Sequence, residues 1–225
     1  MLLASDEAKR IADRLLARSK AEHCAVRIEG ADAVNQRFAR GSATTNGHRS
    51  TLKVTVESLF GRRSGSASVS GFDDNDLDAT LRRSEEIARE APENPESLPP
   101  LGPQSYPTSA RYDAPTAAVR AAQLAGAAKP IIDEASRRDV EVAGYGMAQH
   151  GFDALATSAG LFVHDRHTGA ELTVTARNRA GTWSGWAGVS ETRFGRLDSA
   201  RLGRRAIDKA AHAGSPVLLD PGNIP

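Results

Sequence analysis

The hydrophobic positions of this chain repeat with two different periods. Over residues 5–19 the apolar residues recur every three or four positions with charged residues between them, which is typical of an amphipathic helix that begins at Ser5. From Cys24 the period shortens to two, as in a half-buried strand, and Gly30 then marks a turn. The same two patterns return along the chain. They predict an α+β fold in which helices pack on a mostly antiparallel sheet.

One stretch of the sequence occurs twice. Residues 52–91 align without a gap with residues 172–211, and 13 of the 40 aligned positions are identical. A repeat of this kind predicts an internally duplicated fold. Each unit is expected to hold a helix, four strands and a second helix. The strands of the two units are predicted at about 24–28, 34–40, 52–56 and 64–70, and at about 140–147, 154–163, 171–178 and 182–189.

Local features refine these elements. Residues 64–70 alternate small side chains, so the strand there should lie close to another element. Asp73 and the polar residues after it are expected to cap the next helix. The helix predicted at 116–138 contains Pro130, which should kink or divide it because proline lacks the amide donor. The last helix is expected at about 198–212.

The repeat also suggests how the chain is divided. A first unit is expected at residues 1–91 and a second unit at 116–214. Residues 92–115 hold seven of the eleven prolines and should form an extended connector. Residues 215–225 look like the truncated start of a missing carboxy-terminal domain.

Composition narrows the class of protein. A net charge of +1 with 25% charged residues does not point to a polyanion as the main partner, so nucleic acid is an unlikely ligand. No apolar stretch approaches the ~20 residues of a membrane span, and the first residues are too acidic for a signal peptide. The one cysteine, Cys24, cannot form an internal disulfide. We therefore expect a cytoplasmic protein that makes no membrane contact.

Reactive motifs are sparse. No pair of histidines has the helical spacing, with a glutamate between, that a hydrolytic zinc site needs. His164 and His167 are the only closely spaced histidines, and they are expected at a strand end or turn, where solvated residues are more typical than metal ligands. An enzyme that uses these two histidines with Asp165 is an alternative. We assign no catalytic or metal-binding residue from the sequence.

Two tryptophans and two arginines are the candidates for contact with a peptide or a partner protein. Trp183 and Trp186 are an odd number of residues apart on a predicted strand, so one should face the core and the other the opposite side. The outward tryptophan either floors a groove for an extended peptide or packs beneath the C-terminal helix. Arg37 and Arg40 are expected on an edge strand, where charges usually block aggregation.

The order and spacing of several short segments resemble those of a known family. The segments are RFARGS from Arg37, the hairpin with Gly61 and Ser64-Gly65, AREAPENPE followed by LPPLGP, TSAGLF from Thr157, SGWAG from Ser184, and LDPGN from Leu219. Together they resemble the amino-terminal half of the TldD/PmbA family, bacterial and archaeal proteins once called modulators of DNA gyrase and now regarded as metallopeptidases. Family members usually carry an Asn-Ser pair where this chain has Thr157-Ser158.

The resemblance implies a function for the complete protein. It implies a homo- or heterodimer with a TldD/TldE-type subunit, a hydrolase that cleaves small unfolded peptides or leader peptides in an enclosed chamber. Zinc is expected in the complete catalytic assembly, because the catalytic subunit type carries a HExxxH motif in a following domain. No catalytic residue of the family maps onto this chain. The chain is then a non-catalytic domain that forms chamber wall and subunit contacts, with sheet edges able to pair with an extended peptide substrate.

A different class of function stays open. The final predicted helix carries a basic cluster, which is most simply a solvated face. The alternative is a free-standing regulatory module that docks on a protein or a nucleic acid through this face. The cluster consists of Arg201, Arg204, Arg205 and Lys209.

Overall fold

The computed structural model describes residues 2–107, 109–211 and 221–222, and these residues form the predicted α+β fold. One antiparallel sheet has six strands in the order β3-β2-β1-β4-β5-β6. The strands are β1 (His23–Ala39), β2 (Ser42–Phe60), β3 (Arg63–Val69), β4 (Val140–Thr157), β5 (Phe162–Asn178) and β6 (Ser184–Glu191). The helices are α1 (Ser5–Arg18), α2 (Asp74–Glu90), α3 (Ala114–Ala117), α4 (Ala121–Arg137) and α5 (Ser199–Ala211), with a short η1 (Phe194–Arg196) before the last.

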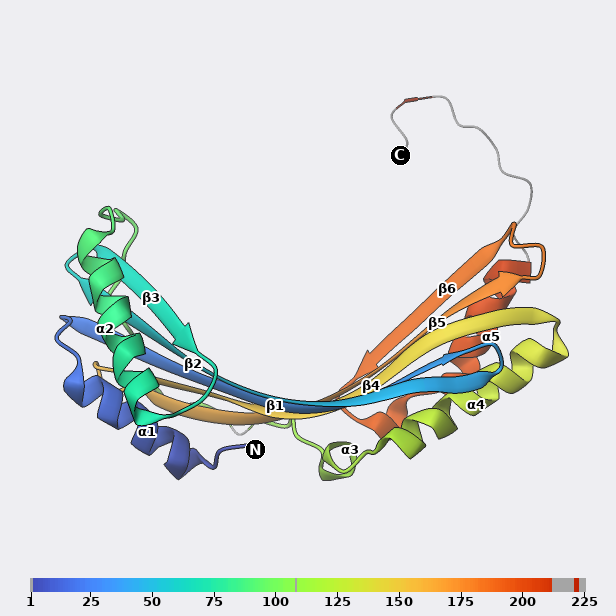
Figure 1. The fold of residues 1–225 in the computed structure, drawn as a ribbon, viewed down its shortest axis with the longest axis horizontal. Coiled ribbons are helices and arrows are strands. Elements are labelled where there is room, and N and C mark those ends of the chain that lie inside the picture. Colours follow the sequence, from blue (N-terminus) through green and yellow to red (C-terminus); the bar gives the residue numbers. More distant parts are fainter. Residues whose placement is uncertain (1, 108, 212–220, 223–225) are drawn as a thin grey trace.

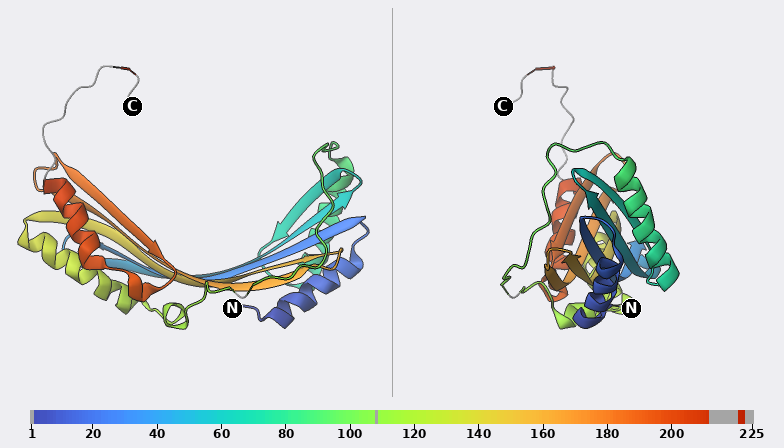
Figure 2. Two further views of the ribbon diagram at one scale, coloured as in Figure 1. Left: turned by 180° about the vertical axis from the view of Figure 1, so that it is seen from behind. Right: turned by 90° about the vertical axis from the view of Figure 1, so that its left-hand side faces the viewer.

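The sheet is strongly curved, and the helices pack on its convex side (Figures 1 and 2). Alternation along the strands gives the sheet two unlike faces. Val26, Val56 and Ala156 lie side by side on the covered face and are buried beneath the helices. The neighbouring positions, such as Arg27 and Thr55, lie on the concave side, which none of the described helices covers. We call this side the open face.

The hydrophobic core is divided between the two ends of the long strands. At one end α1 and α2 cover β1, β2 and the end of β4, around Val26, Val54 and Phe152. At the other end α4 and α5 cover β4, β5 and β6, around Ile131 and Val174. Strands β1, β2, β4 and β5 run the full length between the two helix groups (Figure 1). None of the described helices combines the length and apolar character needed to cross a membrane.

The prediction that the small residues of 64–70 lie against another element is confirmed. A Cβ atom on Gly65 would lie 2.8 Å from the Ile87 carbonyl carbon of α2, and closer still to the Ala88 nitrogen and the Ser84 oxygen. Only glycine lets strand β3 approach the helix backbone this closely. The predicted cap is also present, because Asp73 accepts a hydrogen bond from the Asn75 amide at 2.9 Å.

The prediction of four strands per unit is wrong. No turn occurs at Gly30, and β1 continues through it from His23 to Ala39. The glycine is there because a side chain at position 30 would overlap the ring of Phe152 on the neighbouring strand. Strand β2 likewise extends back to Ser42, over residues that are polar on both faces and show no alternation. In the second unit β4 is one strand as far as Thr157, where two were expected.

The helix predicted at 116–138 does not divide at Pro130. Pro130 lies inside α4, and the chain breaks instead at residues 118–120, between α3 and α4. A new helix start accounts for this break, since the Arg120 amide donates to Gln123 Oε1 at 2.7 Å. The buried face of α4, which includes Ile131, packs on the sheet and compensates for the donor that proline lacks.

The two repeats do not correspond at one constant offset. Gly185 lies against the backbone of α5, as Gly65, 120 residues earlier, lies against α2. The strand β3 and β6 positions therefore follow the predicted alignment. On the helices, however, Ser84 and Ala88 of α2 correspond to Ala206 and Ala210 of α5, a shift of 122 residues.

The strands before the two hairpins also depart from the alignment, because Gly65 pairs with Ser58 and Gly185 with Ala176, a shift of 118 residues. The β2–β3 loop has two residues, since Phe60 pairs with Arg63, whereas Asn178 pairs with Trp183 across a loop of four residues. The gapless alignment is therefore wrong, and the duplication itself stays a prediction. The division into two units also stays a prediction. The expected domain start at 215–225 lies outside the described residues apart from 221–222.

Candidate functional site

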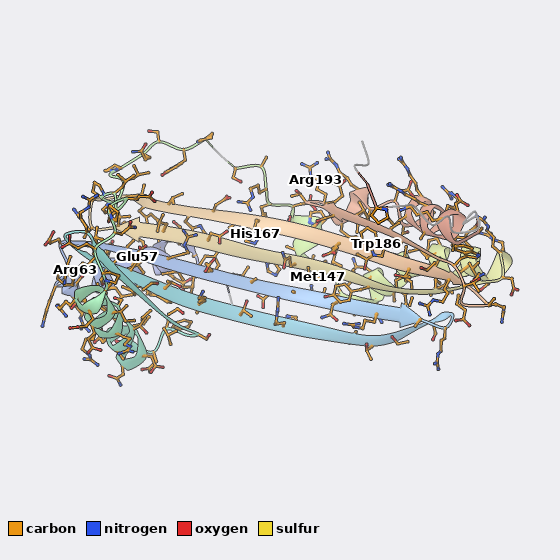
Figure 3. All side chains as sticks on the ribbon, turned by 90° about the horizontal axis from the view of Figure 1, so that it is seen from above. Glu57, Arg63, Met147, His167, Trp186 and Arg193 are labelled. Atoms are coloured by element: carbon orange, nitrogen blue, oxygen red, sulfur yellow. The ribbon has the colours of Figure 1, made fainter. Side chains whose placement is uncertain are left out.

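The open face of the sheet is the candidate site. Figure 3 looks down onto it and shows Glu57, His167, Met147 and Trp186 at successive places along the sheet. An antiparallel sheet with one solvated face is normal, but that face then carries polar side chains. Here the end formed by β4, β5 and β6 carries large aromatic side chains as well, and two of the candidates from the sequence lie on it.

Arg37 belongs to a row of residues that crosses the sheet. The pairing registers place Arg37, Tyr145, Thr173 and Gly188 side by side on β1, β4, β5 and β6. The Arg37 guanidinium carbon lies 5.5 Å from the centre of the Tyr145 ring, which is cation–π distance. A hollow of about 350 Å³ lies around these side chains, and Thr175 also lines it.

Trp186 lies next to this row on the open face. It pairs with Thr175 on β5, and 57% of its surface is exposed. Its indole extends over Gly188, where a Cβ atom would lie 2.7 Å from the ring. The interpretation that this tryptophan packs beneath the C-terminal helix is therefore wrong, because Gly185 faces α5 and the Trp186 side chain points to the other side of the sheet. The Trp186 backbone carbonyl accepts a hydrogen bond from Lys209 Nζ of α5 at 2.8 Å.

The other two candidates lie elsewhere. Arg40 occupies the turn between β1 and β2 with φ of 51° and lines a separate hollow of about 450 Å³ near the end of α4. Trp183 is half-buried at the β5–β6 hairpin, where its amide donates to Asn178 Oδ1 at 3.1 Å. The edge-strand interpretation of the arginines is also wrong, since β1 is paired on both sides.

A β-bulge that the sequence did not reveal positions Arg37. The register of β1 against β2 shifts between Gln36 and Phe38. Gln36 is 5% exposed, and its amide nitrogen donates to the carbonyls of Arg37 at 2.7 Å and Thr45 at 3.0 Å. These bonds satisfy carbonyls at the irregular point of the ladder, and bulges of this kind redirect side chains.

His164 and His167 do not form a common site. Both lie within β5, His164 near its start, and because they are three residues apart they point to opposite faces of the sheet. His164 stacks on Phe152 with ring centres 5.4 Å apart, on the covered face. His167 lies on the open face, with Nδ1 3.3 Å from an oxygen of Asp153. Within residues 2–107, 109–211 and 221–222, no three His, Cys, Asp or Glu side chains gather as metal ligands, so a zinc ion does not fit these residues.

Another hollow lies on the covered face, in the middle of the sheet. It measures about 960 Å³ and is bounded by the strands and α3. Asp32 and His150, which pair across β1 and β4, line it. A hydrogen bond from Ser50 lowers the pKa of Asp32, and burial lowers the pKa of His150, whose Nδ1 is buried without a partner. No sequence pattern marked this place.

The basic face of α5 is solvent-exposed as expected. Arg201, Arg204 and Arg205 are exposed, whereas Lys209 is directed to the β6 backbone. The face is therefore a solvated surface with three arginines, outside the hollow of the open face.

One comparison with known proteins points to a family. Residues 107–213 match the family described as the PmbA/TldA metallopeptidase central domain. No curated protein sequence matches the chain.

Solved structures share the fold at low sequence identity. A protein described as a candidate modulator of DNA gyrase from Bacteroides thetaiotaomicron is 15% identical, with a TM-score of 0.81 over 93% of this chain and 50% of that chain. A similarly described protein from Thermotoga maritima is 16% identical, with a TM-score of 0.78 over 90% of this chain and 47% of that one. TldE from Thermococcus kodakarensis is 15% identical, with a TM-score of 0.77 over 93% of this chain and 48% of that chain. The chain thus spans about half the length of these proteins.

Proposed function

Because this chain belongs to the TldD/PmbA family, we propose that it is a non-catalytic domain of a family metallopeptidase, with its open face lining a peptide chamber. The observation that carries the proposal is the curved sheet, whose concave side is free of the described helices and carries exposed Trp186 on the same face as Arg37 and Tyr145. A large exposed aromatic in a concave surface is typical of a binding site, since it leaves apolar area in water until a ligand covers it.

The pairing of β2 supports contact with an extended chain. Residues 54–60 of β2 pair with β3, whereas residues 42–52 pair with β1 alone. The outer backbone groups of residues 42–52 have no neighbouring strand in the described part of the chain. Such an edge can pair with a peptide main chain or with another subunit. On β6, by contrast, the backbone carbonyl of Trp186 already accepts a hydrogen bond from Lys209 Nζ.

Zinc and the partner belong to the same proposal. The complete assembly would be a dimer with a TldD/TldE-type subunit, and it would process peptides or leader peptides with zinc held outside the described residues. We assign no step of peptide hydrolysis to residues of this chain, because none of the described side chains gather as metal ligands. The chain would contribute chamber wall and subunit contacts.

The experiment uses the purified chain. We expect it to bind no stoichiometric zinc by elemental analysis and to cleave no peptide. It should bind extended peptides weakly, and binding should weaken when Trp186→Ala removes the exposed indole. Tightly bound zinc together with peptide hydrolysis by the chain alone would contradict the proposal.

The exposed arginines of α5 favour a second candidate, a regulatory module that binds nucleic acid. That function predicts salt-sensitive DNA binding, because phosphate contacts release counterions. Reversing the charges of Arg201, Arg204 and Arg205 should then abolish it. Under the peptidase proposal the same triple variant binds peptides like the wild type.

A further inference from the structure

We infer that the open face selects peptides that carry a carboxylate and an aromatic side chain four residues apart, with the carboxylate bound by Arg37 and the aromatic ring by Trp186. This inference rests on the proposed function and narrows it to a class of substrate. It concerns the hollow of about 350 Å³ around Arg37 and Tyr145.

Arg37 is the charged side chain of the hollow. Arg37 takes part in none of the ion pairs among the described residues, and the other residues around the hollow are uncharged. By register, Glu171 lies one row away on β5, opposite Met147, and Glu141 lies two rows the other way, opposite Arg177. The guanidinium is therefore a positive charge on a neutral part of the surface, which is complementary to an acidic group.

Tyr145 and Gln36 position the guanidinium of Arg37. Its guanidinium lies over the face of the Tyr145 ring, and such stacking leaves the N–H groups along its edge free. Those groups form a planar fork that matches the two oxygens of a carboxylate. Gln36 supports this arrangement from below, because its amide holds the bulge at which Arg37 sits.

The distance between Arg37 and Trp186, the two proposed anchors, sets the spacing of the peptide side chains. Arg37 on β1 and Trp186 on β6 are separated by β4 and β5, which is three strand spacings, or about 14 Å. An extended peptide rises about 3.3 Å per residue, so about four residues cover this span. Side chains four positions apart in an extended chain point to the same side. A peptide crossing the strands can therefore place both side chains on the open face at once.

The side chains between Arg37 and Trp186 are small. Thr173 and Thr175 line the floor, and Gly188 lies beneath the indole. These residues are small and neutral, so they leave room for the peptide backbone and add hydroxyl groups with which it can form hydrogen bonds. The middle of the peptide should accordingly be selected weakly.

The test uses tryptophan fluorescence. The Trp183→Phe variant leaves Trp186 as the single reporter in the described part of the chain. It is titrated with blocked peptides in which Glu and Phe are separated by three serines, in both orders. We expect these peptides to bind about tenfold tighter than the same peptides with Gln in place of Glu. Peptides with one or five serines between the anchors should lose this advantage.

Two further arms identify the source of the carboxylate. A peptide whose acid is its free C-terminus, four residues after Phe, is compared with its amide. Binding of either acid, the side chain or the terminus, supports the inference and tells which one the site accepts. In Arg37→Gln the preference for acid should disappear, and in Arg37→Glu a Lys peptide should bind better than a Gln peptide. Arg40→Gln, in the nearby turn, is the matched control and should behave as wild type.

The outcomes separate the two proposals. If Glu and Gln peptides bind equally well at Trp186, the carboxylate selection is wrong and the proposed peptide-contact face stands. If no peptide of any sequence changes the Trp186 signal, both are wrong. A preference for acid that survives Arg37→Gln also contradicts the inference, because another cation must then bind the carboxylate.

Discussion

Strand β3 lies so close to α2 that one added methyl group should destabilise the protein. In Gly65→Ala the new Cβ would lie 2.8 Å from the Ile87 carbonyl carbon and nearer still to two other backbone atoms of α2. Ordinary contacts begin at about 3.4 Å, and helix backbone cannot rotate away as a side chain can. The helix must therefore retreat by roughly 1 Å, and a gap of that size loses up to about half of the contact energy across it.

The magnitude follows from the side chains that α2 buries. Leu77 and Leu81 are almost fully buried, and burying each is worth about 1.5–3 kcal/mol. Losing a quarter to a half of that contribution costs roughly 1–3 kcal/mol. Alanine also lowers the entropy of the unfolded chain relative to glycine, which returns about 0.5 kcal/mol. We expect a net loss of about 2 kcal/mol in the free energy of unfolding.

Urea denaturation followed by circular dichroism measures this change. The melting temperature should fall by about 4–8 °C for a chain of this size. Gly185→Ala should cost a similar amount, since its Cβ would lie 2.8 Å from the Ala210 nitrogen of α5. Gly126→Ala is the control, because nothing lies within 4 Å of its Cβ on the exposed side of α4, and it should stabilise by about 0.5–1 kcal/mol. A Gly65→Ala protein as stable as wild type would refute the close contact between β3 and α2.

Three other predictions follow from the structure. Glu85→Ala should cost about 2 kcal/mol in urea denaturation, because buried Glu85 accepts a hydrogen bond from the Lys20 amide at 2.7 Å. Gln36→Leu should cost a similar amount and weaken peptide binding, since it leaves the carbonyl of Thr45 without its donor. Burial lowers the pKa of His150, so the folded state releases its proton more readily than the unfolded state. Stability should therefore fall as the pH drops below about 6.5, and His150→Leu should flatten that slope in unfolding measured across pH 5–7.

The sequence predicted elements whose signals are local. The first helix, the cap at Asp73 and the last helix are governed by nearby residues, so their positions could be read directly. The tight fit at Gly65 was also predictable, because small residues alternate around it. The long strands were not, since Gly30 indicates a turn in the sequence while in the fold it makes room for Phe152, 122 residues away.

The candidate site was predictable only in part. Arg37 and Trp186 could be selected by residue type, but their common face depends on strand register. Tyr145 and Thr173 enter the site only because β4 and β5 lie between β1 and β6, and no local pattern predicts that order. The bulge held by Gln36 is likewise a property of paired strands.

The most direct test of the central claim is the location of a bound peptide. An extended peptide that carries a photoreactive phenylalanine is cross-linked to the purified chain, and the modified residues are identified by mass spectrometry. The account predicts cross-links on the open face, at Tyr145, Met147 or Trp186. Cross-links confined to the helices of the covered face, such as the arginines of α5, would contradict it.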